Sequence, residues 1–108
     1  MGSSKTMTYR ASVYILRCSD GSYYTGITRR EIAERMDEHQ RGADRFAYTF
    51  SRRPVEIVWC THFERIDEAI ETERRIKRWN RAKKEALIQG DYDALPALAS
   101  RSRRKKKL

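Results

Sequence analysis

Short runs of β-branched and aromatic residues mark the first half of the chain. Two such runs, residues 11–17 and 22–27, flank the polar stretch at residues 19–21. This pattern predicts a β-hairpin, because a Gly within the connecting residues supplies the positive φ that a tight loop requires. A third run, residues 55–63, follows Pro54 and alternates in polarity, which predicts a further strand.

Apolar residues recur at helical spacing in three other segments. The first covers residues 29–41 and is followed by Gly42 as a terminator. The second begins at Ile66, with acidic residues near its start and basic residues near its end, as the helix dipole favours. A short third helix is expected over residues 81–89, before Gly90. The pattern predicts an α+β domain: a small three-stranded, mostly antiparallel sheet flanked by about three helices.

The hairpin carries two tyrosines, Tyr14 and Tyr24, whose relation depends on the length of the loop. Because side chains alternate between the faces of a sheet, a two-residue turn would place the two phenols on opposite faces. A three-residue loop at residues 19–21 pairs Leu16 with Tyr24 and brings both phenols to one face. We predict the three-residue loop, with Gly21 at a positive φ.

The length and the ends of the chain suggest how it is organised. A chain of 108 residues is long enough for one domain with one modest core. Residues 1–8 are small and polar, which predicts a flexible arm, and residues 9–90 hold the periodic segments that form the domain. Residues 91–108 are expected to dock loosely and to end in a disordered basic tail.

The charge of the chain points to a polyanionic partner. The formal net charge is +9, and six of the basic residues lie within residues 101–108, which leaves about +3 for the rest. Lys and Arg gain affinity for nucleic acid by releasing the counterions condensed on phosphates. No apolar run is long enough for a signal peptide or a membrane span. We therefore expect DNA or RNA as the partner, no membrane association, and a cytoplasmic location with reduced thiols at Cys18 and Cys60.

One carboxylate stands out on the second helical segment. Glu73 projects into the middle of the apolar stripe that Ile66, Ala69, Ile70 and Ile76 form. An unpaired carboxylate that faces a core is costly, so Glu73 needs a cation, a metal ion or a cleft. A structural ion pair with Arg35 or Lys77 is an equally good reading of the pattern.

Other polar residues have both a structural and a functional reading. Arg35 and His39 lie on the same helical face as the apolar residues of their segment. Tyr14 and Tyr24 are residue types that simply favour strands. Seven basic residues and Trp79 lie between Arg74 and Lys84, where they form either a phosphate-contacting face or solvated helix charge. The candidate nucleic-acid-binding residues are Arg74, Lys77, Arg78, Lys83, Lys84, Arg103, Arg104 and Lys105.

The ordered set of these residues resembles the GIY-YIG nuclease superfamily over residues 11–88. Ser12-Val13-Tyr14 stands where the family has GIY, and Tyr24-Thr25-Gly26 stands where it has YIG. Arg35 and His39 match the family's helical Arg and its neighbouring Tyr or His, and Glu73 matches its metal-binding glutamate. The chain looks closest to the small stand-alone bacterial subgroup.

This resemblance implies an endonuclease that hydrolyses phosphodiester bonds in DNA, structure-selective or weakly sequence-specific, with a role in DNA repair. It implies one Mg²⁺ or Mn²⁺ held by Glu73 and water, and a phosphate held by Arg35. Tyr14 or Tyr24 would orient or deprotonate the attacking water, and His39 would assist. The alternative is a catalytically idle nucleic-acid-binding module or adaptor. In either case a protein partner could supply specificity, and the sequence does not indicate an oligomeric state.

The chain also departs from the family pattern. Ser12 replaces the first Gly, Thr25 replaces the middle Ile of YIG, and Ile27 stands where some members carry Lys. Asn80 is a candidate for the family's downstream Asn. These departures leave the strength of catalysis open.

Overall fold

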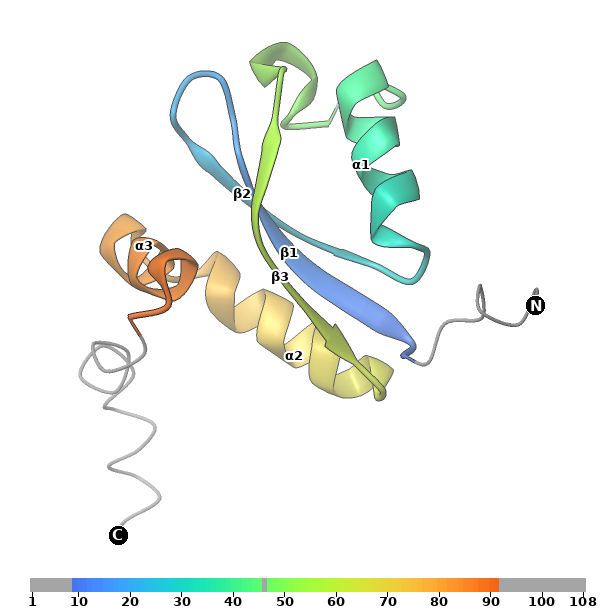
Figure 1. Ribbon diagram of the computed structural model, residues 1–108, viewed down its shortest axis with the longest axis vertical. Coiled ribbons are helices and arrows are strands. Elements are labelled where there is room, and N and C mark those ends of the chain that lie inside the picture. The colour runs from blue at the N-terminus through green and yellow to red at the C-terminus, as the bar shows by residue number, and fades with distance from the viewer. Residues whose placement is uncertain (1–8, 46, 92–108) are drawn as a thin grey trace, which may run out of the picture. The chain divides into compact units, whose positions relative to one another are not determined.

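The computed structural model describes residues 9–45 and 47–91. Within them, three antiparallel strands form one sheet in the order β2-β1-β3 (Figure 1). The α+β fold with a three-stranded antiparallel sheet is thereby confirmed. In chain order the elements are β1 (Ala11–Arg17), β2 (Tyr23–Thr28), α1 (Ile32–Arg41), the 3₁₀ turn η2 (Phe50–Arg52), β3 (Glu56–Phe63), α2 (Ile66–Lys77) and α3 (Arg81–Gln89).

The boundaries differ from the sequence expectation mainly at the start of α1. This helix begins at Ile32 rather than at residue 29, because the preceding residues form a turn in which the backbone N–H of Arg30 donates to Thr28 Oγ1 at 3.1 Å. β3 begins one residue later than expected. The backbone of Val55, just before it, is instead bonded in both directions to the amide of Gln40, at 2.7 and 3.1 Å. This side chain ties the end of α1 to the start of β3.

The hairpin has the predicted three-residue loop. Leu16 pairs with Tyr24, the N–H of Cys18 donates to the carbonyl of Ser22 at 2.9 Å, and Gly21 has φ 86°. Tyr14 pairs with Gly26, two residues along β1, so Tyr14 and Tyr24 project from the same face of the sheet. The register prediction is confirmed.

β1 is the central strand and its residues 11–16 are all fully buried. On one face Tyr14 and Leu16 pack with Cys18 and Val55, and α1 adds Ile32 and Met36 to this cluster. Val13 and Ile15 point to the other face, where α2 covers the sheet with Ala69 and Ile76 buried (Figure 1). Helices on both faces explain why β1 is apolar almost throughout.

The chain divides into two compact units, one up to Lys77 and one from Arg78 onward. In the second unit α3 is preceded by Asn80, whose side chain accepts from the backbone N–H of Lys83 at 2.9 Å. It is followed by Gly90 with φ 75°. The end at Gly90 was predicted from the sequence, whereas the cap at Asn80 was not. The expected arm at residues 1–8 and the expected tail, residues 92–108, lie outside the described residues.

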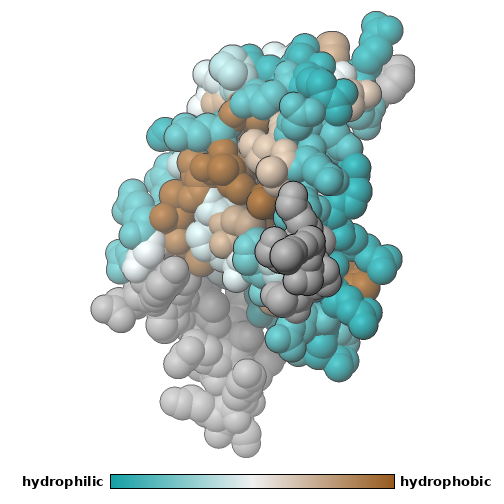
Figure 2. Space-filling view, turned by 45° about the vertical axis from the view of Figure 1, so that its right-hand side comes forward, coloured by the Kyte–Doolittle hydropathy of each residue, from teal (hydrophilic) through white to brown (hydrophobic). Residues whose placement is uncertain are grey.

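The surface drawn in Figure 2 is mostly hydrophilic, and its largest brown area is a hydrophobic patch. Among the described residues, three large hydrophobic side chains are exposed: Tyr48, Ile57 and Ile70. None of the helices within residues 9–45 and 47–91 has the length and apolar character needed to cross a membrane.

Candidate active site

The phenol of Tyr14 is the centre of a buried hydrogen-bond network. Arg35 Nε donates to Tyr14 Oη at 3.2 Å, and His39 Nε2 lies 3.0 Å from the same oxygen. Arg35 and His39 are one turn apart on α1, so they lie on the same helix face, as the sequence pattern predicted. His39 Nδ1 in turn lies 2.9 Å from Thr49 Oγ1. The network therefore joins β1, α1 and the segment before η2.

The protonation states in this network follow from burial. Burial raises the pKa of Tyr14 to about 12, despite the opposing hydrogen bond and charge of Arg35. Burial, followed by the charge of Arg35, lowers the pKa of His39. Both groups are therefore neutral near pH 7. Because a buried hydroxyl needs an acceptor, Tyr14 O–H donates to His39 Nε2. The proton of the neutral ring is then on Nδ1, which donates to Thr49 Oγ1.

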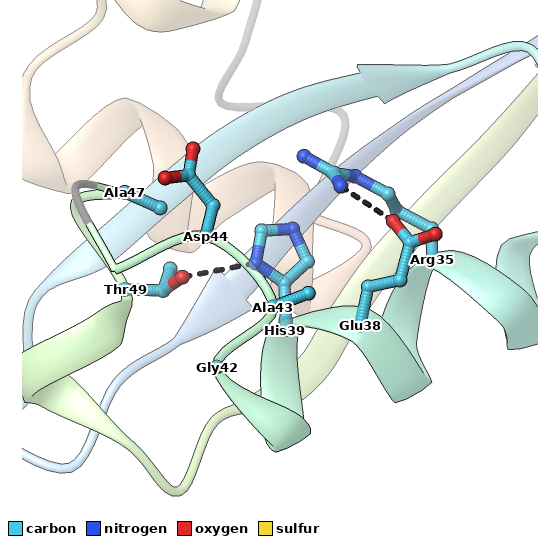
Figure 3. Close-up of a pocket in the computed structure, with 8 residues that line it drawn as sticks. All are labelled: Arg35, Glu38, His39, Gly42, Ala43, Asp44, Ala47 and Thr49. Atoms are coloured by element: carbon cyan, nitrogen blue, oxygen red, sulfur yellow. Dashed lines mark hydrogen bonds and ion pairs between the residues drawn. The ribbon is translucent and has the colours of Figure 1, made fainter.

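The guanidinium of Arg35 is fixed by two partners. Besides its bond to Tyr14, Arg35 Nη1 pairs with Glu38 Oε1 at 2.8 Å (Figure 3). The other carboxylate oxygen of Glu38 pairs with Arg30 at 2.6 Å. Hydrogen bonds from Arg30 and then Arg35 lower the pKa of Glu38, so this carboxylate stays charged. The side chain of Arg35 is 30% exposed, so the guanidinium is held by these bonds without being fully buried.

A small hollow opens beside this network. Figure 3 shows Arg35, Glu38 and His39 from α1 on one side, and Asp44, Ala47 and Thr49 from the following segment on the other. Neither Thr49 nor Glu38 is among the site residues predicted from the sequence. The spacing of Glu38, three residues after Arg35, was a usable signal, because side chains at that separation meet on a helix. Thr49 lies in an aperiodic segment that offered none.

Tyr24 adds the aromatic part of the site. Its ring centroid lies 6.5 Å from that of Tyr14, 5.5 Å from that of His39 and 5.9 Å from that of Tyr48. Tyr24 is only half-buried, whereas Tyr14 is fully buried. Of the two phenols, Tyr24 is the one that solvent can reach.

Glu73 lies on α2 between Ala69 and Ile76, in the apolar stripe where the sequence placed it. It is 9% exposed, and its Oε2 pairs with Lys77 Nζ at 2.8 Å. Of the two cations considered from the sequence, Lys77 is thus the partner, while Arg35 bonds to Tyr14 and Glu38. The hydrogen bond to Glu73 is the main cause that raises the pKa of Lys77, and Tyr24 adds a smaller contribution. Lys77 therefore lies within electrostatic range of both Glu73 and Tyr24.

Comparisons with known proteins assign the family. The GIY-YIG catalytic domain matches residues 10–86, most of the described chain. This chain belongs to the GIY-YIG family. A UPF0213 protein of Halobacterium salinarum is 45% identical over 76 residues, which span 70% of this chain and 96% of that protein. A UPF0213 protein of Staphylococcus aureus is 43% identical over 77 residues, spanning 71% of this chain and 92% of that one.

Two solved structures resemble this GIY-YIG chain. A solution NMR structure of a protein from E. faecalis has 34% sequence identity and a TM-score of 0.52, covering 75% of this chain and 84% of that one. A solution NMR structure of a UPF0213 protein from Bacillus halodurans has 38% identity and a TM-score of 0.49, covering 73% and 82%. The sequence identity to the UPF0213 proteins of Halobacterium salinarum and Staphylococcus aureus, and the share of each that is covered, place this chain in the small UPF0213 group of the GIY-YIG family.

The GIY-YIG motifs show how this chain differs from the family pattern. Ser12, in place of the first Gly, lies with its Oγ 2.6 Å from His62 Nδ1 and so gains a partner on β3. Thr25, in place of the middle Ile, is 2% exposed, and its Oγ1 has no hydrogen-bond partner among the described residues. Asn80, the candidate for the downstream Asn, caps α3. Neither Ser12 nor Thr25 removes a member of the Tyr14 network.

The chemistry of Glu73 determines which metal this GIY-YIG site would suit. Among residues 9–45 and 47–91, no group of three or more His, Cys, Asp or Glu side chains is placed to hold a metal ion. A single buried carboxylate is too few ligands for a structural zinc site. It suits Mg²⁺ or Mn²⁺, hard cations that keep several waters and bind through one or two carboxylates together with substrate phosphates.

The candidate nucleic-acid-binding residues fall in both units. In the first, Arg74 is exposed on α2 and Lys77 is engaged with Glu73. In the second, Arg78 is exposed and Lys83 Nζ lies 5.6 Å from the ring centroid of Trp79, a cation–π contact. Lys84 is half-buried on α3. Arg103, Arg104 and Lys105 lie outside the described residues.

Proposed function

We propose that this protein is a divalent-metal-dependent endonuclease that hydrolyses phosphodiester bonds in DNA, structure-selective or weakly sequence-specific. The observation that supports this proposal is the convergence of Tyr14, Arg35 and His39 in one hydrogen-bond network, with Tyr24 on the same face. A binding module needs a basic surface but no buried phenol that holds an arginine in place. The network is built to fix a cation in one orientation, which is a requirement of phosphoryl-transfer catalysis.

Arg35 would bind the non-bridging oxygens of the scissile phosphate. Its bonds to Tyr14 and Glu38 hold the guanidinium before substrate arrives, so little reorganisation is needed as negative charge builds up. The partly exposed guanidinium would form charge-assisted hydrogen bonds to phosphate oxygens. Glu38 and Arg30 then act as positioning residues for Arg35.

The two phenols have different roles in this proposal. Tyr14 is a poor base near neutral pH, because its pKa is about 12 and its oxygen is already bonded to Arg35 and His39. Tyr24 is half-buried and reachable by water, so it is the better candidate to orient or deprotonate the nucleophile. His39 is bonded at both ring nitrogens, which makes it a positioning residue for Tyr14.

Glu73 would hold Mg²⁺ or Mn²⁺. When bound, such an ion supplies Lewis-acid polarisation of the phosphate and stabilises the leaving oxygen. The chain's own contribution is a carboxylate kept almost out of solvent on a rigid helix, with Lys77 as its counter-charge. Because the side chain of Lys77 is 54% exposed, its ammonium would be able to turn toward a phosphate once Glu73 holds another cation.

The basic residues would bind the nucleic-acid backbone. Arg74, Arg78, Lys83, Lys84 and the basic residues of the C-terminal segment add phosphate contacts that carry no sequence information. We propose DNA as the principal substrate, with RNA as the competing one, a partner protein as the source of specificity, and a cytoplasmic location. We also propose that residues 9–90 form the nuclease domain.

The rival proposal is a catalytically idle nucleic-acid-binding module or adaptor. The ion pair between Glu73 and Lys77 favours it, because a carboxylate neutralised by its own helix can serve stability alone. The two proposals differ in what they expect when Glu73 loses its charge.

A cleavage panel with Glu73→Gln separates them. Branched, nicked, single-stranded and double-stranded DNA, with matched RNA, are incubated with Mg²⁺ or Mn²⁺. We expect wild-type cleavage that Glu73→Gln lowers by about a hundredfold or more, with binding retained. Glu71→Gln is the matched control, since Glu71 forms an i,i+4 pair with Arg75 at 3.4 Å on the exposed side of the same helix. It should cleave at the wild-type rate.

Thermal unfolding of both variants completes the test. A functional Glu73 gives a folded, inactive variant, whereas a purely structural ion pair gives a large fall in melting temperature. Wild-type protein that cuts no substrate with either ion, together with strong destabilisation by Glu73→Gln, would leave the binding module as the better description.

A further inference from the structure

An exposed aromatic and cationic pair adjoins the candidate site. Tyr48 is 42% exposed, the highest value among the large hydrophobic side chains of the described residues. The guanidinium carbon of Arg52 lies 3.8 Å from the centroid of the Tyr48 ring, which is close cation–π stacking. Neither residue is among those predicted from the sequence to have a role.

This pair continues the aromatic series of the site. Tyr24 contacts His39 edge to face on one side and stacks on Tyr48 on another, with 21° between the two tyrosine planes. From the Tyr14 network the rings thus lead through Tyr24 to Tyr48 and end at the guanidinium of Arg52. The series runs from the buried phenol to solvent.

Several bonds hold the pair in place. Arg52 Nη1 donates to the backbone carbonyl of Tyr48 at 2.8 Å, and Arg52 Nε pairs with Asp20 at 3.1 Å. Asp20 is itself fixed by Ser22, which donates to it from both its backbone N–H and its hydroxyl. Holding an exposed Tyr48 and Arg52 in one arrangement costs side-chain entropy. A surface that is already ordered loses less entropy when it binds a ligand, which favours binding.

We propose that Tyr48 and Arg52 form a stacking site for a nucleobase of the substrate, on the nucleotide next to the scissile phosphate. This inference rests on the proposed function, because it takes the phosphate to lie at Arg35 and Tyr24. A base joined to that phosphate through one sugar would lie against the surface next to Tyr24, where Tyr48 stacks. Aromatic rings and arginine planes bind bases through their π faces without regard to base identity. The site therefore adds affinity and positions the nucleotide, but it does not read sequence.

The test compares a short thymidine oligonucleotide with an abasic sugar–phosphate chain of the same length and charge. Binding is measured by fluorescence anisotropy in EDTA, so that no cleavage occurs, for wild-type protein and for Tyr48→Leu. The wild type should bind the thymidine chain about tenfold more tightly than the abasic chain. Tyr48→Leu should lose most of this preference and bind both chains alike.

Three further variants isolate stacking from folding and from charge. Tyr48→Phe keeps the ring and should keep the preference, whereas Arg52→Gln should reduce it. Tyr9→Leu is the matched control, because Tyr9 is another tyrosine that stacks on a neighbouring ring, that of His62 at 4.1 Å. It should leave the preference unchanged.

The outcomes distinguish this inference from the function on which it rests. A base preference that persists in Tyr48→Leu, in protein whose melting temperature is unchanged, overturns the stacking site while leaving the nuclease proposal intact. A wild-type protein that binds neither chain overturns both. Equal binding of the two chains by the wild type overturns the stacking site alone.

Discussion

Gly26 and Tyr14 face each other across the β1–β2 ladder so closely that no side chain fits between them. A Cβ atom added at Gly26 would lie 2.5 Å from both the Cζ and the hydroxyl oxygen of Tyr14. Gly26 has an ordinary strand backbone, since the positive-φ glycines are elsewhere, so its requirement is one of space. The Gly of the YIG motif thus lets the phenol of the GIY motif lie flat over β2.

Replacing this glycine should displace the phenol. We expect Gly26→Ala to push Tyr14 off its bonds with Arg35 and His39, to cost about 1–3 kcal/mol of stability and to lower activity sharply. Gly21→Ala is the control: it has open space but φ 86°, so it should cost about 1 kcal/mol and keep activity per folded molecule. Denaturant unfolding and cleavage rates check both variants. Full activity in Gly26→Ala would show that Tyr14 does not need its present position.

The raised pKa of Tyr14 predicts a stability loss at alkaline pH. The folded state holds the phenolic proton up to about pH 12, whereas an unfolded tyrosine releases it near pH 10. Its contribution is therefore fully present below pH 10 and is lost as the pH rises toward 12. Two pKa units correspond to about 3 kcal/mol. We expect wild-type protein to lose roughly this much relative to Tyr14→Phe between pH 9 and 12, as measured by urea unfolding. Parallel curves for the two proteins would contradict the buried neutral phenol.

Lys77 should compete with a metal ion for Glu73. Its ammonium lies 2.8 Å from the carboxylate and must give way when a divalent cation binds. We expect Lys77→Gln to bind Mn²⁺ about threefold to tenfold more tightly, as measured by calorimetry or by the paramagnetic resonance of free Mn²⁺. Arg75→Gln removes the same charge from the exposed Arg75–Glu71 pair of that helix and should change the affinity little. If Mn²⁺ binding depends on Glu73 but has the same affinity in the wild type, Lys77→Gln and Arg75→Gln, Lys77 does not compete with the metal ion.

Thr25 should be a site where substitution stabilises the protein. Its hydroxyl is buried and has no partner among the described residues, which is unfavourable relative to a methyl group of the same shape. We expect Thr25→Val to gain about 1 kcal/mol and a few degrees of melting temperature. Thr28→Val is the matched control on the same strand: Thr28 Oγ1 accepts from the N–H of Arg30, so its loss should destabilise. A loss of stability in Thr25→Val would mean that its hydroxyl is satisfied in solution.

Local pattern was enough to place the residues of the hairpin and of α2. The three-residue loop fixed the register, and the register alone decided that Tyr14 and Tyr24 share a face, because strand side chains alternate strictly. Helical spacing likewise placed Glu73 between Ala69 and Ile76, since residues three and four apart share a helix face. These relations depend on neighbouring residues of one element, so they are readable along the chain.

Tertiary structure decided which of these residues touch each other. Two contacts of the site involve a segment whose apolar residues have no regular spacing: His39 with Thr49, and Arg52 with the Tyr48 ring. In such a segment the sequence does not indicate where a side chain points. The sequence also left undecided whether Glu73 pairs with Arg35 or with Lys77. In the structure Glu73 pairs with Lys77, and Arg35 bonds to Tyr14. These contacts depend on how α1 and α2 pack on opposite faces of the sheet. The spacing of residues along the chain does not specify the distances between packed elements.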